Sequence, residues 1–387
     1  MKVRALFGKV AAFFFVVSQI YAQAPQYSVT DLGILPGGTY SLGEGVNNLG
    51  QVVGYSEVSG SYQQAIFYST GNALQNLGTL GGNYSYAYGI NDAGQIGGNA
   101  STAGDSAQHA VLFSPGHPTQ DLGTLGGNSS QGFGINSLGQ VAGFAYLPGD
   151  SVYHAALFSA GHAPQDLGTL GGSNSEGYGI NTSGQVGGVS YLAGDSAYHA
   201  ALFSAGNAPQ DLGTLGGTWS GGYAINNAGQ VAGYSWIAGN NGFHATVFSP
   251  GNAPHDLGTL GGSYSYAFGI NNLGQAVGYS YLAGNNGFDG FLYTGGTMYG
   301  LDSLVSAAAG IRNIYVDSGG NSINDLGQIA AVGTMPDGSQ HALLLTPEVV
   351  PEPGTWLAAA LTASACALGY GRRRFSKVER RALRRFG

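Results

Sequence analysis

The sequence predicts an all-β fold, a seven-bladed β-propeller in which each blade is a four-stranded repeat of about 45 residues. Two markers carry this prediction. Asp-Leu-Gly recurs every 45 residues from Asp121 to Asp256. An Asn-x-x-Gly-Gln segment occurs in seven copies, which begin at Asn47, Asn91, Asn136, Asn181, Asn226, Asn271 and Asn324. A period of about 40 to 45 residues with glycine-rich turns is typical of propeller blades, whereas helical repeats show apolar residues at a spacing of about 3.6.

The composition is that of a folded chain. Of the 387 residues, 43% are apolar and 11% are aromatic, and only 8% are charged. A disordered chain combines low hydrophobicity with high net charge. We therefore expect this chain to fold despite its 70 glycines.

The repeat at residues 121–165 illustrates the expected strands, because turn residues bound four short runs within it. We expect strands at residues 131–136, 140–144, 154–159 and 164–170, the last of which enters the next repeat. The Asn-x-x-Gly-Gln segment is the hairpin turn between the first two strands, with its glycine at the position that needs a positive φ.

The two ends of the repeat region supply complementary strands of one four-stranded repeat. The region begins with a fourth-strand sequence at residues 27–35 and finishes with a third-strand sequence at residues 341–345. The N-terminal strand can therefore complete the last blade, which closes the ring and removes exposed sheet edges. An open β-solenoid of the same units is the alternative, but it would normally need atypical capping repeats at both ends.

Residues 1–22 have the layout of a secretory signal peptide. Lys2, Arg4 and Lys9 precede an apolar run at residues 10–17, and small residues lie near Ala22. The run is too short to span a bilayer, which takes about 20 apolar residues. We expect signal peptidase to cut after Ala22, so that the protein leaves by the general secretory route. A buried N-terminal strand or helix is the alternative.

Residues 348–387 form a three-part segment, with Pro351-Glu352-Pro353, an apolar stretch at residues 356–370 and an arginine-rich tail. An apolar stretch followed by basic residues predicts a short transmembrane helix with its bases in the cytoplasm. The segment closely resembles the PEP-CTERM sorting signal. This resemblance implies recognition by an exosortase in the inner membrane, cleavage near the motif, and release or attachment at the cell surface. A plain stop-transfer anchor without processing is the alternative.

The repeats also resemble a known family. Asp-Leu-Gly-Thr-Leu-Gly-Gly, Gly-Ile-Asn-x-x-Gly-Gln-Val and His-Ala-x-Leu-Phe are similar to the extracellular HAF repeat, over roughly residues 27–346. The resemblance implies export and a repeat architecture, which we assign to residues 23–347. It implies no activity.

The repeat region is strongly acidic. Residues 23–348, which we call the body, contain 18 acidic residues and one base, Arg312, which gives a net charge of 1 − 18 = −17. A body with a single cation cannot neutralise phosphates, so we exclude nucleic acid as a partner. The one cysteine, Cys366, lies in the C-terminal apolar stretch, so the body has neither a disulfide nor a thiolate metal site.

One polar pattern suggests catalysis, but we interpret it as structural. The segment Gly-Asp-Ser-x-x-His pairs a carboxylate with an imidazole in three repeats, as Asp105/His109, Asp150/His154 and Asp195/His199. An enzyme needs one such dyad, whereas a pair repeated in successive blades is expected to fasten a loop to its sheet by a hydrogen bond. We predict no catalytic residue, no metal site and no cofactor. Calcium is the alternative, although the acidic residues form no dense oxygen cage.

Aromatic residues mark a candidate binding face. In a four-stranded antiparallel blade, the loop after the second strand and the crossing between blades share one end. Aromatic side chains recur at both places, and rings with hydroxyls alongside are suited to stacking on sugars. The predicted ligand-binding residues are Tyr84, Tyr146, Tyr191, Trp219, Trp236, Tyr264 and Tyr281. The alternative is that these rings only pack between adjacent blades.

The sequence thus predicts an exported, non-catalytic cell-surface or extracellular-matrix protein that binds polysaccharide or another surface component. We expect a neutral exopolysaccharide, because the net charge of −17 would repel acidic polymers. The alternative is an extracellular carbohydrate-active enzyme, a hydrolase or lyase on the same ring. Glycoside hydrolysis would need two carboxylates about 5–10 Å apart, and Glu44, Glu57 and Glu176 are candidates that depart from the repeat.

Overall fold

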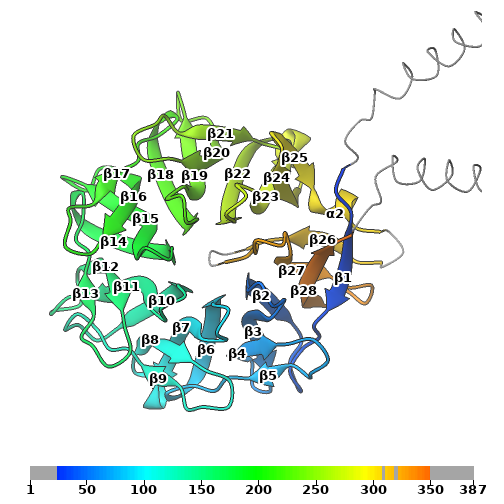
Figure 1. Ribbon diagram of the computed structural model, residues 1–387, viewed down its shortest axis with the longest axis horizontal. Coiled ribbons are helices and arrows are strands. Elements are labelled where there is room, and N and C mark those ends of the chain that lie inside the picture. Colours follow the sequence, from blue (N-terminus) through cyan, green and yellow to red (C-terminus); the bar gives the residue numbers. More distant parts are fainter. Residues whose placement is uncertain (1–23, 307–309, 318–320, 349–387) are drawn as a thin grey trace, which may run out of the picture. The chain divides into compact units, whose positions relative to one another are not determined.

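A computed structural model describes residues 24–306, 310–317 and 321–348. The compact unit from Tyr27 to Pro347 consists mainly of β-strands in antiparallel sheets, so the prediction of an all-β fold is confirmed. Within this unit the sheets follow one another around a ring (Figure 1). The predicted signal peptide, C-terminal transmembrane helix and Pro351-Glu352-Pro353 motif lie outside the described residues.

Six repeats each contribute four strands to a sheet in chain order, and the first of these strands lies nearest the centre of the ring (Figure 1). The first three sheets contain β2 (Ser41–Val46), β3 (Val52–Val58), β4 (Tyr62–Tyr68) and β5 (Gln75–Asn76); β6 (Gly81–Ile90), β7 (Ile96–Thr102), β8 (Gln108–Phe113) and β9 (Gln120–Asp121); and β10 (Ser130–Ile135), β11 (Val141–Tyr146), β12 (Tyr153–Phe158) and β13 (Gln165–Asp166). The next three contain β14 (Gly171–Ile180), β15 (Gln185–Leu192), β16 (Tyr198–Ser204) and β17 (Gln210–Asp211); β18 (Gly216–Ile225), β19 (Val231–Ile237), β20 (Phe243–Phe248) and β21 (His255–Gly258); and β22 (Gly261–Ile270), β23 (Ala276–Leu282), β24 (Phe288–Thr294) and β25 (Thr297–Gly300).

The last sheet has the order β1-β28-β27-β26 and joins the two ends of the repeat region. Its strands are β26 (Arg312–Tyr315), β27 (Ile329–Thr334), β28 (Gln340–Pro347) and β1 (Tyr27–Asp31). The short helical turns of the described residues are η1 (Ala103–Asp105), η2 (Ala283–Asn285) and α2 (Leu301–Leu304). A single parallel bridge, Phe243 to Tyr264, merges the sheets β18–β21 and β22–β25 into one of eight strands.

The strands of the third sheet test the expectation for residues 121–165. β10, β11 and β12 lie within two residues of the predicted bounds, but the fourth strand, β13, has only two residues, Gln165–Asp166. The prediction of a long fourth strand was wrong, because only Gln165 and Asp166 pair with β12 and the chain turns at Gly168, after one further hydrogen bond from the Leu167 amide to Ala155. The Asp166 carboxylate accepts a hydrogen bond from the amide of Gly168 at 2.8 Å, and Gly168 has a φ of 72°.

The hydrophobic core lies between neighbouring sheets. Ile135 and Val141 of the third sheet pack in one cluster with Ala110 and Leu112 of the second. The third strands supply fully buried phenylalanines, namely Phe113, Phe158, Phe203, Phe248 and Phe291. Since burial of one such side chain stabilises the fold by about 1.5–3 kcal/mol, each sheet depends on its neighbours for stability.

The N-terminal strand pairs with the last repeat, as predicted. β1 runs antiparallel to β28, in register from Tyr27 opposite Pro347 to Asp31 opposite Leu343. The Leu32 amide adds a hydrogen bond to the carbonyl of Ala342 at 3.0 Å. One sheet is therefore built from chain segments about 300 residues apart, which ties the first repeat to the last.

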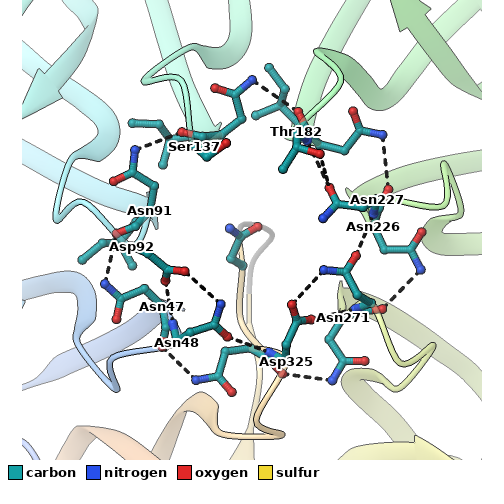
Figure 2. Close-up of a pocket in the computed structure, with 18 of the residues that line it drawn as sticks. Asn47, Asn48, Asn91, Asp92, Ser137, Thr182, Asn226, Asn227, Asn271 and Asp325 are labelled. Carbon is teal, nitrogen blue, oxygen red and sulfur yellow. Dashed lines mark hydrogen bonds between the residues drawn. The ribbon is translucent and has the colours of Figure 1, made fainter.

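A closed circle of asparagine hydrogen bonds joins all seven repeats (Figure 2). The side-chain amide of each Asn-x-x-Gly-Gln asparagine donates to the main-chain carbonyl of the next, and Asn324 donates to Asn47 at 2.8 Å. Asn226 illustrates how fully each amide is used: it also donates to Gln230 Oε1, and its Oδ1 accepts from the amides of Ala228 and Gln230. Every donor and acceptor of this buried side chain thus has a partner, which a substitution would leave unsatisfied.

Candidate binding site

The predicted ligand-binding residues lie at the end of the sheets opposite the asparagine turns, but in strands rather than in loops. The inner strands β6, β18 and β22 begin at the Gly-Gly pair and are ten residues long, so Tyr84, Trp219 and Tyr264 lie within them. Tyr146, Tyr191, Trp236 and Tyr281 lie in the second strands β11, β15, β19 and β23. All seven side chains are half-buried. The expectation that these segments are loops was wrong, because the inner strand keeps pairing with the second strand as far as Gly81, Gly216 and Gly261.

Four of the predicted residues belong to one continuous group of rings. Trp219 contacts Trp236 with centroids 5.4 Å apart, and Trp236 contacts Phe243 at 5.5 Å. Phe243 contacts Tyr264 of the next sheet at 4.7 Å. The group continues through Tyr281 at 5.7 Å to Phe288 at 6.3 Å. We call these six residues, Trp219, Trp236, Phe243, Tyr264, Tyr281 and Phe288, the aromatic arc.

The other three predicted residues each pair with a tyrosine in an adjoining strand. Tyr84 contacts Tyr62 at 5.5 Å, Tyr146 contacts Tyr153 at 5.4 Å and Tyr191 contacts Tyr198 at 5.5 Å. The candidate residues thus occupy the same end of several sheets, and the aromatic arc spans two of these sheets.

The sequence analysis missed a third aromatic position. Phe243 and Phe288 lie at the start of the third strands β20 and β24, directly before the His-Ala marker or its counterpart, and Phe288 is 40% exposed. Tyr153 and Tyr198 occupy the same place in their repeats. The 45-residue period could have revealed this position, since the residue before the marker is aromatic in four successive repeats.

A tyrosine pocket is formed by residues of three successive sheets, β10–β13, β14–β17 and β18–β21. It has a volume of about 230 Å³, and it is lined by Tyr153, Ser175, Glu176, Tyr178, Val189, Tyr191, Tyr198, Tyr223 and Tyr234. The Tyr178 hydroxyl donates a hydrogen bond to the Glu176 carboxylate. Burial, followed by the charge of Glu176, raises the pKa of Tyr178 well above its usual range. The tyrosine therefore stays protonated and can donate at any physiological pH.

Of the three glutamates considered for catalysis, Glu44 and Glu57 lie in one sheet and Glu176 lies in another. Glu44 is buried in β2 and Glu57 lies in β3, whereas Glu176 lies in β14. The sheets β6–β9 and β10–β13 come between them around the ring (Figure 1). Glu176 is thus separated from Glu44 and Glu57 by two sheets.

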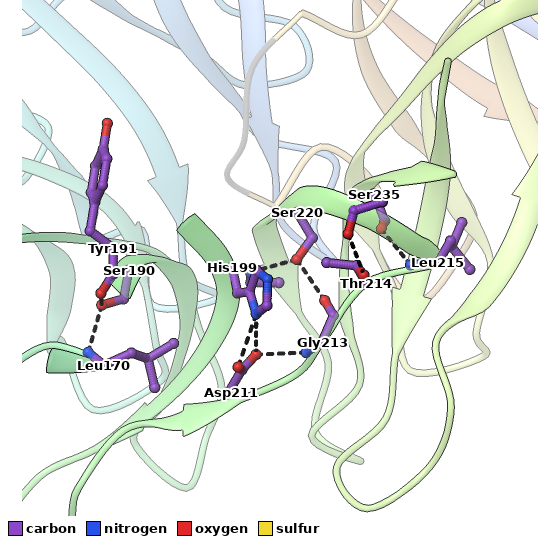
Figure 3. A network of polar contacts seen from close by, with 12 residues as sticks. Leu170, Ser190, Tyr191, His199, Asp211, Gly213, Thr214, Leu215, Ser220 and Ser235 are labelled. Carbon is purple, nitrogen blue, oxygen red and sulfur yellow. Dashed lines mark hydrogen bonds and ion pairs between the residues drawn. The ribbon is translucent and has the colours of Figure 1, made fainter. Parts of the chain in front are cut away.

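The predicted aspartate–histidine pairs have other partners. The Nδ1–H of His199 donates to Asp211 at 2.8 Å, not to Asp195 (Figure 3). His109 likewise pairs with Asp121 and His154 with Asp166. Asp105, Asp150 and Asp195 instead accept from the main-chain amides of Asn83, Asn128 and Ser173. The predicted partners were wrong because each of these aspartates adopts a positive φ in the turn before the histidine strand, and its carboxylate reaches the start of the inner strand.

Each histidine joins the third and fourth strands of its sheet. In Figure 3, Asp211 also accepts from the amide of Gly213 at 2.8 Å, so one carboxylate holds both the histidine and the following turn. The same arrangement recurs at His109, His154, His244 and His341, whose partner is Asp31. These histidines therefore fasten the fourth strand to the third, rather than a loop to its sheet as predicted, with the Asp-Leu-Gly aspartate as the partner.

The sixth repeat replaces this histidine by Asp289, which places two carboxylates together. Burial, and then the charge of Asp302, raises the pKa of Asp289 to about 7. An unfolded aspartate titrates near 3.9. The folded protein therefore binds this proton more tightly, and its free energy of unfolding falls as the pH rises from about 4 to about 7.

We expect Asp289→Asn to raise the melting temperature at pH 8 and to leave it almost unchanged at pH 4. The gain at pH 8 is about 1–2 kcal/mol, because partial solvent exposure reduces the full effect of the pKa shift. Asp256→Asn is the matched control: burial raises the pKa of Asp256, but hydrogen bonds from His244 and Gly258 bring it below its usual value. That variant should lose stability at pH 8. Equal effects of Asp289→Asn at both pH values would contradict the assignment.

A second cavity lies at the centre of the ring, within the circle of asparagines. It has a volume of about 210 Å³, and Asn47, Asn91, Asn136 and their equivalents line it (Figure 2). Because these side chains are engaged in the circle, their polar atoms serve the fold. Among the described residues, no group of three or more His, Cys, Asp or Glu side chains could hold a metal ion. In the same part of the chain, no helix is long and apolar enough to cross a membrane.

No protein-family model and no curated protein matches the chain. Among solved structures, the chain is similar to the BP39L lectin from Burkholderia pseudomallei, with a TM-score of 0.42 and 8% sequence identity. The similarity covers 83% of this chain and 98% of the lectin chain.

Proposed function

We propose that the ring is a seven-bladed β-propeller and that the protein is a non-catalytic module which binds polysaccharide or another surface component. The pairing of β1 with β28 and the closed circle of asparagine hydrogen bonds support a propeller over an open solenoid, because a solenoid has two free ends. The aromatic arc carries the functional proposal.

The aromatic arc combines a continuous series of rings with ring surface that is open for stacking, and both are needed to bind a sugar chain. Its six rings form an unbroken series over two neighbouring sheets, with contacts of 4.7–6.3 Å between successive centroids. The rings are half-buried or, for Phe288, exposed, so each is held in place and keeps a surface for stacking. The body carries one cation against 18 acidic residues, which favours a neutral glycan over an acidic one.

We propose further that the protein is exported and processed. The signal-peptide layout of residues 1–22 and the resemblance of residues 348–387 to a sorting signal support secretion, transient anchoring in the inner membrane and cleavage by an exosortase near Pro351-Glu352-Pro353. The mature protein would then lie at the cell surface or in the extracellular matrix. Intact-mass measurement of the extracellular protein tests this, and an uncleaved tail would contradict it.

A glycan array combined with product analysis separates a binding module from an enzyme. We expect the purified protein to be retained on neutral polysaccharides without releasing new reducing or unsaturated ends. Two sheets separate Glu176 from Glu44 and Glu57, which argues against a catalytic pair that includes Glu176, because hydrolysis needs two carboxylates about 5–10 Å apart. Appearance of such ends, in proportion to the protein added, would favour the hydrolase or lyase.

A further inference from the structure

The tyrosine pocket departs from the repeat at the positions that shape it. Glu176 occupies a position where the other repeats at the same phase have Tyr86, Gln131, Gly221 and Tyr266. Its neighbour on the next inner strand is Gly221, and a Cβ there would lie 2.8 Å from the ring of Tyr234. Any larger residue would therefore displace that ring. The repeat alone requires neither the carboxylate nor the glycine, so the pocket is specific to this part of the ring.

The pocket combines one negative charge with many aromatic rings. Among the described residues that line it, Glu176 is the only charged side chain and six are tyrosines. The one basic residue of the body, Arg312, lies in β26 of the last sheet and does not line the pocket. The charge of Glu176 is thus offset by no basic group of the pocket wall.

Polar atoms of the pocket are already paired with one another. The Tyr178 hydroxyl donates to Glu176, and the hydroxyls of Tyr198 and Tyr234 lie 2.9 Å apart. Burial, the charge of Glu176 and a hydrogen bond with its carboxylate raise the pKa of Tyr153 as well. A sugar would have to break these contacts to satisfy its own hydroxyls. A cation that donates no hydrogen bonds would leave them intact.

We propose that the tyrosine pocket binds a small organic cation through a methylated or quaternary ammonium group. Aromatic faces attract such a cation through their quadrupole, and the Glu176 carboxylate adds a fixed opposite charge. The volume of about 230 Å³ is below the range of about 300–1,000 Å³ that accommodates drug-sized ligands, which suits a head group rather than a sugar chain. This site shares no residue with the aromatic arc, and the two meet where Tyr234 of the pocket contacts Phe243 of the arc at 5.5 Å.

Calorimetric titration of the full-length protein with choline and with its uncharged isostere, 3,3-dimethylbutan-1-ol, tests the proposal without any substitution. The two ligands have the same shape, so only the charge distinguishes them. We expect choline to bind at least about tenfold more tightly, the equivalent of one desolvated charge interaction. Equal affinities, or no binding of either ligand at millimolar concentration, would overturn the proposal. Binding of glucose in competition with choline would identify the pocket as a sugar site instead.

Variants then locate the site. Glu176→Gln keeps the shape of the side chain and should weaken choline binding about tenfold. Glu57→Gln removes the same charge from another sheet and should leave the affinity unchanged. Tyr191→Leu removes a ring and should cost about fivefold, whereas Tyr191→Phe keeps the ring and should bind as the unmodified protein does. Equal effects of Glu176→Gln and Glu57→Gln, at unchanged melting temperatures, would place the cation elsewhere.

Discussion

Deletion of residues 27–35 is expected to abolish cooperative folding of the entire ring. These residues supply β1 and the segment that leads to β2, and they bury Tyr27, Leu32 and Leu35, each less than 7% exposed. Loss of three such side chains costs about 5–9 kcal/mol. A domain of ordinary stability has about 5–15 kcal/mol in total.

The deletion also removes polar contacts that join the last repeat to the first. Tyr27 donates its hydroxyl to the carbonyl of Gly327, and Asp31 accepts from His341 at 2.8 Å. The Ser41 hydroxyl donates to the carbonyl of Gly33. Without β1, the strand β28 becomes an exposed edge with unpaired backbone groups, which invites aggregation.

Thermal unfolding of the truncated protein measures this effect, and a peptide of residues 24–36 added in trans provides the control. We expect the truncated protein to have no cooperative transition, or one at a much lower temperature. The peptide should restore part of the stability by pairing with β28, and a scrambled peptide should not. A truncated protein that melts at the same temperature as the intact one would show that the repeats are stable without closure.

The repeat made much of the fold predictable from the sequence. The Asn-x-x-Gly-Gln turn fixes a hairpin locally, because Asn136 and Gly139 form the turn hydrogen bonds themselves and Gly139 has a φ of 75°. The pairing of β1 with the last repeat was predictable, because the repeat region begins with a fourth-strand sequence and finishes with a third-strand sequence. The length of β13 was not, because it depends on how far the chain stays beside β12, and only Gln165 and Asp166 pair with that strand.

The candidate site was less predictable, because it depends on contacts between repeats. The period placed Trp219 and Trp236 at one end of their sheet, but it could not show that Phe243 continues the series to Tyr264 of the next sheet. The histidine partners were misassigned for the same reason. His199 is four residues from Asp195 in sequence, but it meets Asp211 because the fourth strand lies beside the third. The tyrosine pocket depends on Gly221, because a larger residue there would displace the ring of Tyr234. One glycine among 70 does not stand out in the sequence, so the pocket was not predictable.

Replacement of both Trp219 and Trp236 by alanine is expected to remove most of the glycan retention. The two rings begin the aromatic arc, lie on the paired strands β18 and β19 and contact each other at 5.4 Å, so the double replacement removes one end of the arc. Stacking contributes about 1 kcal/mol per ring beyond burial, and loss of two rings corresponds to about a thirtyfold weaker affinity. Because both rings are half-buried, the melting temperature should fall only moderately.

Affinity chromatography on the polysaccharide that retains the unmodified protein tests the central claim most directly. The control is the double variant Leu138→Ala/Leu273→Ala, which removes two side chains 72% and 71% exposed in the asparagine turns, at the opposite end of the sheets. We predict that the tryptophan variant elutes early while the leucine variant elutes with the unmodified protein. If the tryptophan variant is retained as strongly as the unmodified protein, or if it no longer folds, the arc is not the glycan-binding surface and the rings serve the packing of the sheets.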